Sequence, residues 1–156
     1  MTGEVRDVLE ANERFYRALN DLDLAGMDGL WSHESFVCCV HPGWELIVGW
    51  DAVRASWEGI FRGSGGPAHR VEAADVSVHV ASDIGWVSCI ERITLPGLPG
   101  SAGGPGAASS STSLAVASNL FQRSSNEVGR WEMILHHASL LPLGIAETMD
   151  SPEVIH

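Results

Sequence analysis

The spacing of apolar side chains predicts three helices in the first part of the chain. Over residues 4–20 they recur every three or four positions, which is typical of an amphipathic helix. Asp23 is suited to cap a second, short helix over residues 24–31. A third helix is expected to open at Gly49 and to end at the glycine-rich residues 63–67.

The remaining pattern predicts strands. Apolar runs at residues 35–40 and 44–48 indicate two short strands, separated by a turn at His41-Pro42-Gly43. From His69 onward the apolar period changes to two, which predicts a meander of four strands. These strands are expected over residues 71–80, 85–95, 114–122 and 131–138, with an irregularity near residues 73–75. Helices followed by a run of consecutive strands define an α+β class.

We interpret the chain of 156 residues as a single domain over residues 1–156. Residues 96–112 are rich in Gly, Pro and Ser, so we expect a flexible loop there. The tail over residues 140–156 shows no clear periodicity.

Charge and length exclude two classes of partner. The formal net charge is -11, and all nine basic residues are arginine. Such a chain lacks the basic surface that nucleic acids and anionic membranes attract, so we expect neither partner. The longest apolar stretch, residues 133–146, falls short of the roughly 20 residues that span a bilayer. The acidic, polar N-terminus is unlike a signal peptide.

The cysteines favour a reducing compartment. Cys38, Cys39 and Cys89 are odd in number and form no C-x-x-C pair. A disulfide framework or zinc ribbon is therefore not expected, and we predict buried thiols in a cytoplasmic protein.

Several segments together resemble the nuclear transport factor 2-like superfamily, and in particular its SnoaL-like and ketosteroid isomerase-like branch. The resemblance extends over about residues 4–140 and is carried by Asn12–Leu19, Asp23–Trp31, His41–Trp44, Gly49–Trp57 and Trp131–Ser139. It implies a cone-shaped α+β barrel, in which about three N-terminal helices pack on a strongly curved, mixed but mostly antiparallel sheet. It also implies an open end that admits a small hydrophobic or aromatic molecule, and a homodimer formed through the outer face of the sheet.

The resemblance also implies site residues. In the isomerases of this superfamily the general base is an Asp followed by Pro at the end of the first strand, and the matching dipeptide here is His41-Pro42. Their hydrogen-bond donor is a Tyr of the first helix, which corresponds here to Phe15 or Tyr16. Asn119 lies in the strand region that holds their second acid. The isomerase set is therefore not carried over intact.

The residues themselves point to histidine chemistry. His41 follows an apolar strand, and an imidazole with a pKa near 6.5 is a suitable acid or base. His136 and His137 are adjacent on the last strand, where successive side chains point to opposite faces, so at most one enters a cavity unless a bulge intervenes. The histidine spacing matches no common metal motif, and we predict no metal site.

Aromatic side chains are expected to build the wall of the cavity. Trp44 and Trp57 flank the candidate segment, and Trp31 and Phe15 are further candidates for ligand contact. Glu91 stands among apolar residues of a predicted strand. It could be a pocket carboxylate, but we favour a partner of Arg92 or Arg123 across the sheet, because an unpaired buried Glu is costly.

These observations favour a protein with a pocket for a small apolar molecule. We expect an acid–base enzyme of the isomerase, dehydratase or cyclase type without an organic cofactor. In this hypothesis His41 is the base, a histidine of the last strand is the acid or orienting group, and Tyr16 or Asn119 polarises the substrate. The alternative is a non-catalytic ligand-binding or dimerisation module of the same fold.

Overall fold

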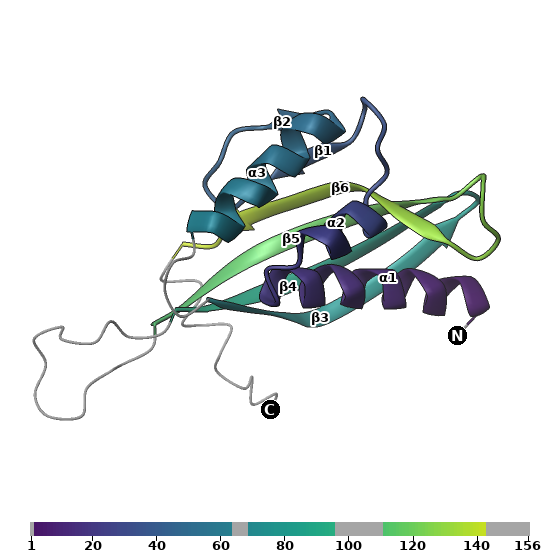
Figure 1. Ribbon diagram of the computed structural model, residues 1–156. Helices are drawn as coiled ribbons and strands as arrows, with labels where there is room; N and C mark the ends of the chain where they lie inside the picture. Colours follow the sequence, from purple (N-terminus) through teal and green to yellow (C-terminus); the bar gives the residue numbers. More distant parts are fainter. Residues whose placement is uncertain (1, 64–68, 96–110, 143–156) are drawn as a thin grey trace, which may run out of the picture.

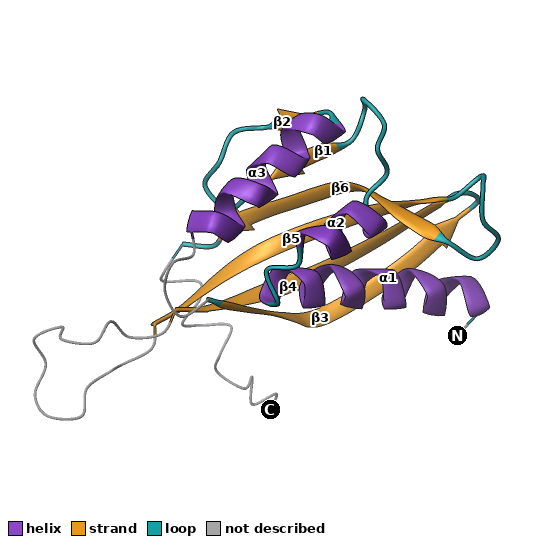
Figure 2. Cartoon of the chain, in the orientation of Figure 1, coloured by secondary structure: helices purple, strands orange, loops and turns teal. Residues whose placement is uncertain are grey.

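The computed structural model describes residues 2–63, 69–95 and 111–142. Helices and strands follow one another in the predicted order (Figures 1 and 2). The elements are α1 (Gly3–Asn20), α2 (Leu24–Leu30), β1 (Cys38–Val40), β2 (Ile47–Val48), α3 (Trp50–Gly63), β3 (Arg70–Ala81), β4 (Ile84–Leu95), β5 (Ser111–Arg123) and β6 (Trp131–Leu140).

The strands form one mixed sheet in the order β2-β1-β6-β5-β4-β3. Strands β3 to β6 make the predicted antiparallel meander, and β1 joins it by pairing in parallel with β6. All three helices lie on the same side of the sheet, with α1 along the meander and α3 over β1 and β2 (Figure 2). The predicted α+β class and the cone-shaped arrangement are thus confirmed.

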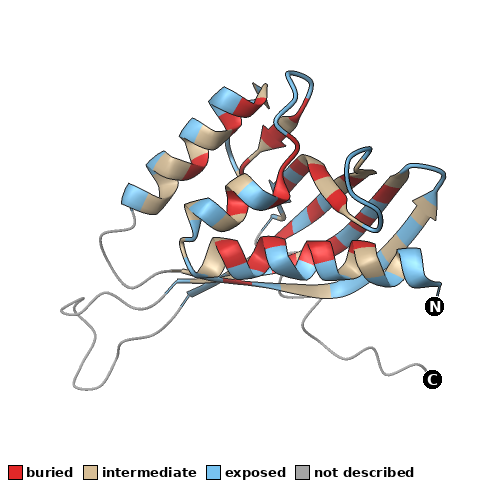
Figure 3. Ribbon diagram, turned by 45° about the vertical axis from the view of Figure 1, so that its right-hand side comes forward, coloured by how far each residue is buried: buried red, intermediate tan, exposed pale blue. Residues whose placement is uncertain are grey.

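Helix α1 forms because its ends are capped and one of its faces is apolar. The Thr2 hydroxyl accepts a hydrogen bond from the Val5 amide at 3.4 Å, as an N-cap does. The buried face of α1 packs against the sheet, as the alternating colours of the helix show (Figure 3). A Cβ at Gly85 would lie 2.6 Å from a methyl of Val8, so this close approach of helix and strand requires glycine.

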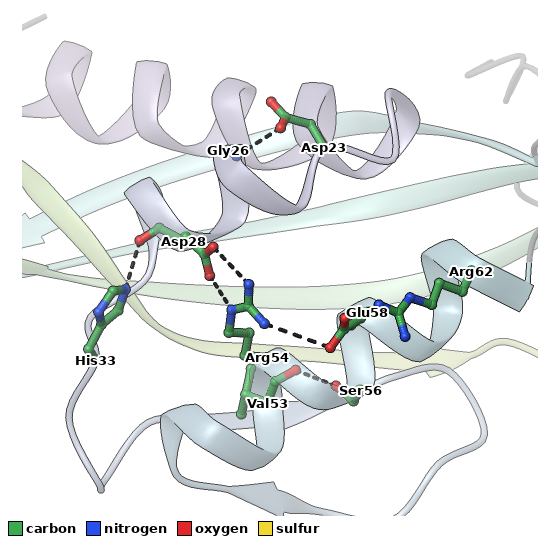
Figure 4. Close-up of polar contacts among 9 residues, drawn as sticks. All are labelled: Asp23, Gly26, Asp28, His33, Val53, Arg54, Ser56, Glu58 and Arg62. Atoms are coloured by element: carbon green, nitrogen blue, oxygen red, sulfur yellow. Dashed lines mark hydrogen bonds and ion pairs between the residues drawn. The ribbon is translucent and has the colours of Figure 1, made fainter.

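An ion-pair cluster joins α2 to α3 (Figure 4). The Arg54 Nε lies 2.7 Å from the Asp28 Oδ1, and Arg54 also faces Glu58 at 3.7 Å. Glu58 is paired in turn with Arg62 at 2.7 Å, and His33 bonds the Asp28 carbonyl oxygen at 2.7 Å. These side chains are partly exposed, so screening by solvent keeps the contribution of each pair to stability small. Their main effect is to fix how α3 lies beside α2.

Both short strands are shorter than the sequence predicts. The chain turns through residues 34–36, and β1 starts only at Cys38. The segment before β2 is a turn and loop, in which the Trp44 amide bonds the His41 carbonyl at 2.9 Å. Local apolar character does not distinguish a paired strand from a loop, because pairing requires a neighbouring strand.

The expected loop and tail fall largely outside the described residues. Strand β5 already begins at Ser111, so the last two residues of the expected loop 96–112 belong to a strand, and residues 96–110 are not described. Similarly, Leu140 is the last residue of β6, while residues 143–156 are not described. The flexibility expected for residues 96–110 and the irregularity expected for residues 143–156 therefore stay predictions.

Candidate active site

A cavity of about 310 Å³ opens between α3, the end of β1 and the inner face of the meander. Its size lies at the lower end of the range of ligand pockets, about 300–1,000 Å³. The cavity wall is mainly apolar, with the polar side chains gathered among the histidines and Glu91. The lining residues are Leu19, His41, Pro42, Trp44, Trp57, Ile60, His69, Val71, Glu91, Ile93, Leu95 and His136.

His41 lies in the pocket wall, just after β1, and is 3 % exposed. Its Nε2 is 2.9 Å from the Ser56 hydroxyl, which itself donates to the Val53 carbonyl at 2.6 Å. Its ring stands edge-on to Trp44 and Trp57, with centroids 4.8 and 4.5 Å away. Burial lowers the pKa of His41 to about 4, so the imidazole is neutral at pH 7.

Of the adjacent histidines, His136 enters the pocket and His137 is exposed on the outer face of the sheet. A bulge is present in β6, but it precedes the two histidines, so their side chains still point to opposite faces of the sheet. Leu120 pairs with Leu135, but the next residue of β5, Phe121, pairs with Met133. This extra residue in β6 reverses the alternation and turns His136, rather than His137, inward.

Glu91 is the functional candidate that the sequence reasoning underrated. It is 2 % exposed, lines the pocket, and its Oε1 accepts a hydrogen bond from the Tyr16 hydroxyl at 2.8 Å. The favoured pairing with Arg123 is wrong, because Arg123 is bound to Glu4 and Asp83. The signal was available, since Glu91 shares the strand parity of the buried residues Val87 and Cys89.

Asn119 links the polar groups behind the pocket. Its Oδ1 lies 2.6 Å from the His136 Nδ1, and its Nδ2 lies 3.1 Å from the Tyr16 hydroxyl and 2.8 Å from the Asn12 Oδ1. Asn119 is fully buried and is not part of the cavity wall. The structure therefore brings Tyr16, Asn119, Glu91 and His136 into one network, with Asn119 in a supporting position.

Burial sets the charges of this network. Desolvation raises the pKa of Glu91 to about 7, against the opposing effect of the Tyr16 hydrogen bond. Desolvation, with smaller contributions from His41 and His137, lowers the pKa of His136 to about 3. The His136 Nε2 and the Glu91 Oε1 are 3.9 Å apart, but a neutral His136 makes no ion pair at pH 7. Burial also raises the pKa of the Tyr16 phenol, which stays protonated.

Some of the other aromatic candidates line the cavity, and the others are packed in the hydrophobic core. Trp57 is buried in the cavity wall, and Trp44, half of whose surface is exposed, lies beside His41. Phe15 packs behind the wall, with its ring centroid 4.7 Å from that of His136. Trp31 stacks on Trp50 at 6.1 Å and is not part of the cavity wall. Among the described residues, no three His, Cys, Asp or Glu side chains are placed to hold a metal ion.

A curved mixed sheet with helices on its concave side and a cavity between the two defines the nuclear transport factor 2-like α+β fold. The chain belongs to the family of SnoaL-like domains, whose family model matches residues 8–144. This family was expected from the sequence. Membership determines the fold, but it does not determine the reaction, because one fold can host many functions.

The proteins similar to this chain include two solved structures and one curated protein. A Streptomyces avermitilis protein of the NTF2-like family, called a "putative dehydratase", is 29% identical, with a TM-score of 0.74 over 88% of this chain and 96% of its own. A Thiobacillus denitrificans protein, called a "putative calcium/calmodulin-dependent protein kinase type II association domain", is 27% identical, with a TM-score of 0.65 over 85% and 93% of the two chains.

The curated protein is the F-box protein SKIP8 of Arabidopsis thaliana, which is 27% identical over 136 residues. The match takes in 87% of this chain, which spans about half the length of that relative. Among the described residues, no helix has the length and apolar character needed to cross a membrane.

Proposed function

We propose that this protein binds a small, flat, apolar molecule in the cavity and transfers a proton to or from it, with Glu91 as the acid–base group. The observation that carries the proposal is a carboxyl group held by Tyr16 at 2.8 Å in the wall of a mainly apolar cavity. Its pKa of about 7 is matched to proton transfer at neutral pH. The reaction would be of the isomerase, dehydratase or cyclase type and would need no organic cofactor.

Glu91 is better suited to this role than His41, the base that the sequence suggests. A base whose conjugate acid has a pKa of about 4 accepts a proton weakly at pH 7. In this proposal His41 and His136 remain neutral and orient the bound molecule. The name of the Streptomyces relative supports acid–base chemistry in a pocket of this fold.

The ligand-binding part of the proposal can be tested with N-phenyl-1-naphthylamine, a neutral, flat, apolar dye whose fluorescence rises in apolar surroundings. We expect saturable binding to the wild type and at least tenfold weaker binding to Ile93→Phe, because the larger ring fills the cavity. Val128→Phe, at a fully exposed position of the β5–β6 hairpin, is the matched control and should bind like the wild type. Equal binding by both variants would place the dye outside this cavity and contradict the proposal.

We also propose a homodimer formed through the outer face of the sheet. This face exposes Trp86 and Val116 beside the partly buried Ile90 and Leu120, and one 27%-identical relative is called an association domain. In sedimentation at micromolar concentration, we expect twice the mass of the 16.7 kDa chain. Val116→Asp should give the monomer and Val128→Asp the dimer, whereas a monomeric wild type would contradict the proposal.

A further inference from the structure

The polar side chains around the buried end of the cavity form hydrogen bonds with one another. The Tyr16 hydroxyl lies between the Glu91 Oε1 and the Asn119 Nδ2, at 2.8 and 3.1 Å. The second hydrogen of the Asn119 amide points to the Asn12 Oδ1 at 2.8 Å. The Asn119 Oδ1 is left to face the His136 Nδ1 at 2.6 Å.

The direction of this chain follows from the charge of Glu91. Above pH 7 the carboxylate is ionised and only accepts, so the Tyr16 hydroxyl must donate to it. Asn119 must then donate to the Tyr16 oxygen through its Nδ2, and its Oδ1 accepts the hydrogen of the His136 Nδ1. A neutral imidazole with its hydrogen on Nδ1 has a lone pair on Nε2, the atom that lies 3.9 Å from Glu91.

The same reasoning applies to His41. The Ser56 hydroxyl has a single hydrogen, which it donates to the Val53 carbonyl at 2.6 Å. The His41 Nε2 must therefore carry a hydrogen and donate it to the Ser56 oxygen at 2.9 Å. The unprotonated nitrogen of His41 is then Nδ1. Both neutral histidines thus have their hydrogens bound within the protein.

We infer that the ligand of this cavity is an alcohol or phenol, whose hydroxyl group donates its single hydrogen to the carboxylate of Glu91, beside the lone pair of the His136 Nε2. The inference rests on the proposed function and specifies the class of molecule that the cavity accepts. Once a ligand has displaced water, buried acceptors without a donor are costly, which disfavours a ketone or carboxylate at this position. It also disfavours an isomerase that forms an enolate, since such an oxyanion needs free N–H or O–H groups.

The other described residues of the cavity wall are consistent with a ligand that donates a hydrogen bond. The titratable side chains that face Glu91 or share the cavity wall with it are Tyr16, Cys39, His41, His69, Cys89 and His136. This set contains neither lysine nor arginine, so it offers no permanent cation to a carbonyl or carboxylate ligand. The indole N–H of Trp57 does not change the picture, because this atom is completely buried behind the cavity surface.

The test compares 1-tetralol with 1-tetralone, two probes of one skeleton that differ in having a hydroxyl or a carbonyl. In calorimetric titrations at pH 8, we expect the wild type to bind the alcohol at least tenfold more tightly. Glu91→Gln should lose most of this preference, because the new amide can donate to the ketone. Glu10→Gln, on the exposed face of α1, is the matched control and should keep it.

Equal or tighter binding of the ketone by the wild type would overturn the inference. If the naphthylamine dye binds in the cavity but the alcohol is not preferred, the inference fails and the proposed pocket stands. If neither the dye nor either tetralin derivative binds, the proposed function fails together with the inference.

Discussion

Glu91→Gln is expected to slow proton abstraction from 5-nitrobenzisoxazole by about a hundredfold or more, the usual contribution of a general base. A base that removes the carbon-bound proton of this flat ring opens it. The C–H electron pair forms the third bond of the nitrile, the N–O bond breaks with its electron pair on oxygen, and the ring-opened product is a coloured cyanonitrophenolate. A buried carboxylate in an apolar wall is a strong base for this probe, because little water solvates its charge.

The pH dependence of this rate identifies the base. With Glu91 as the base, the rate should rise with pH to a plateau, with a midpoint at about pH 7. With His41 as the base, the midpoint would lie at about pH 4, and His41→Gln rather than Glu91→Gln would abolish the rate. Glu10→Gln is again the control. A Glu91→Gln variant that keeps its rate would rule out the role proposed for Glu91.

The second large effect concerns stability. The folded-state pKa of Glu91 is raised from 4.5 to about 7, so the folded protein binds this proton more tightly than the unfolded chain does. The free energy of unfolding that Glu91 contributes therefore falls as pH rises from about 4.5 to 7, and it is constant above that range. The Glu91→Gln variant has no carboxyl group at this position, so its free energy of unfolding does not fall in this way. Relative to the wild type, the variant should gain about 2–3 kcal/mol between pH 5 and pH 8.5.

The measurement is urea unfolding followed by tryptophan fluorescence, at one protein concentration and several pH values. Glu10→Gln should run parallel to the wild type at every pH. A constant difference between Glu91→Gln and the wild type would mean that Glu91 titrates normally and is not desolvated as described.

The histidines act in the opposite direction in the wild type itself. Their folded-state pKa values are lowered from 6.5 to about 4 for His41 and about 3 for His136. The unfolded chain thus binds these protons more tightly, and stability rises with pH up to about 6.5. Taken together, the rise due to the histidines and the fall due to Glu91 cancel near pH 7, where these three groups contribute most to stability.

The sequence predicted the fold well because its signals are local. The apolar period over residues 4–20 and the alternation in the meander depend on neighbours in the chain, and both were confirmed. The irregularity predicted near residues 73–75 is also present, as a register shift between Ala74 and Ser77. The short strands were overextended because β1 pairs with β6, which lies almost a hundred positions further along the chain, and β2 pairs only with β1.

The site was harder to predict, because its geometry is set by contacts between distant elements. The sequence indicated His41 and His136 by residue type, but only the β6 bulge decides between His136 and His137. Glu91 was expected to pair with a cation, because an unpaired buried carboxylate is costly. Its partner in the structure is instead the neutral hydroxyl of Tyr16. A neutral donor is sufficient at this position because the carboxyl group can also take up a proton.

The parallel pairing of β1 with β6 has a consequence for how the cavity comes into being. It brings His41, which directly follows β1, beside His136 of β6, although more than half of the described residues lie between them in the chain. During synthesis the N-terminal helices and the first hairpins can form early, but the cavity cannot close until β6 has left the ribosome. Binding of any small molecule in this cavity would therefore indicate that β6 has paired with β1.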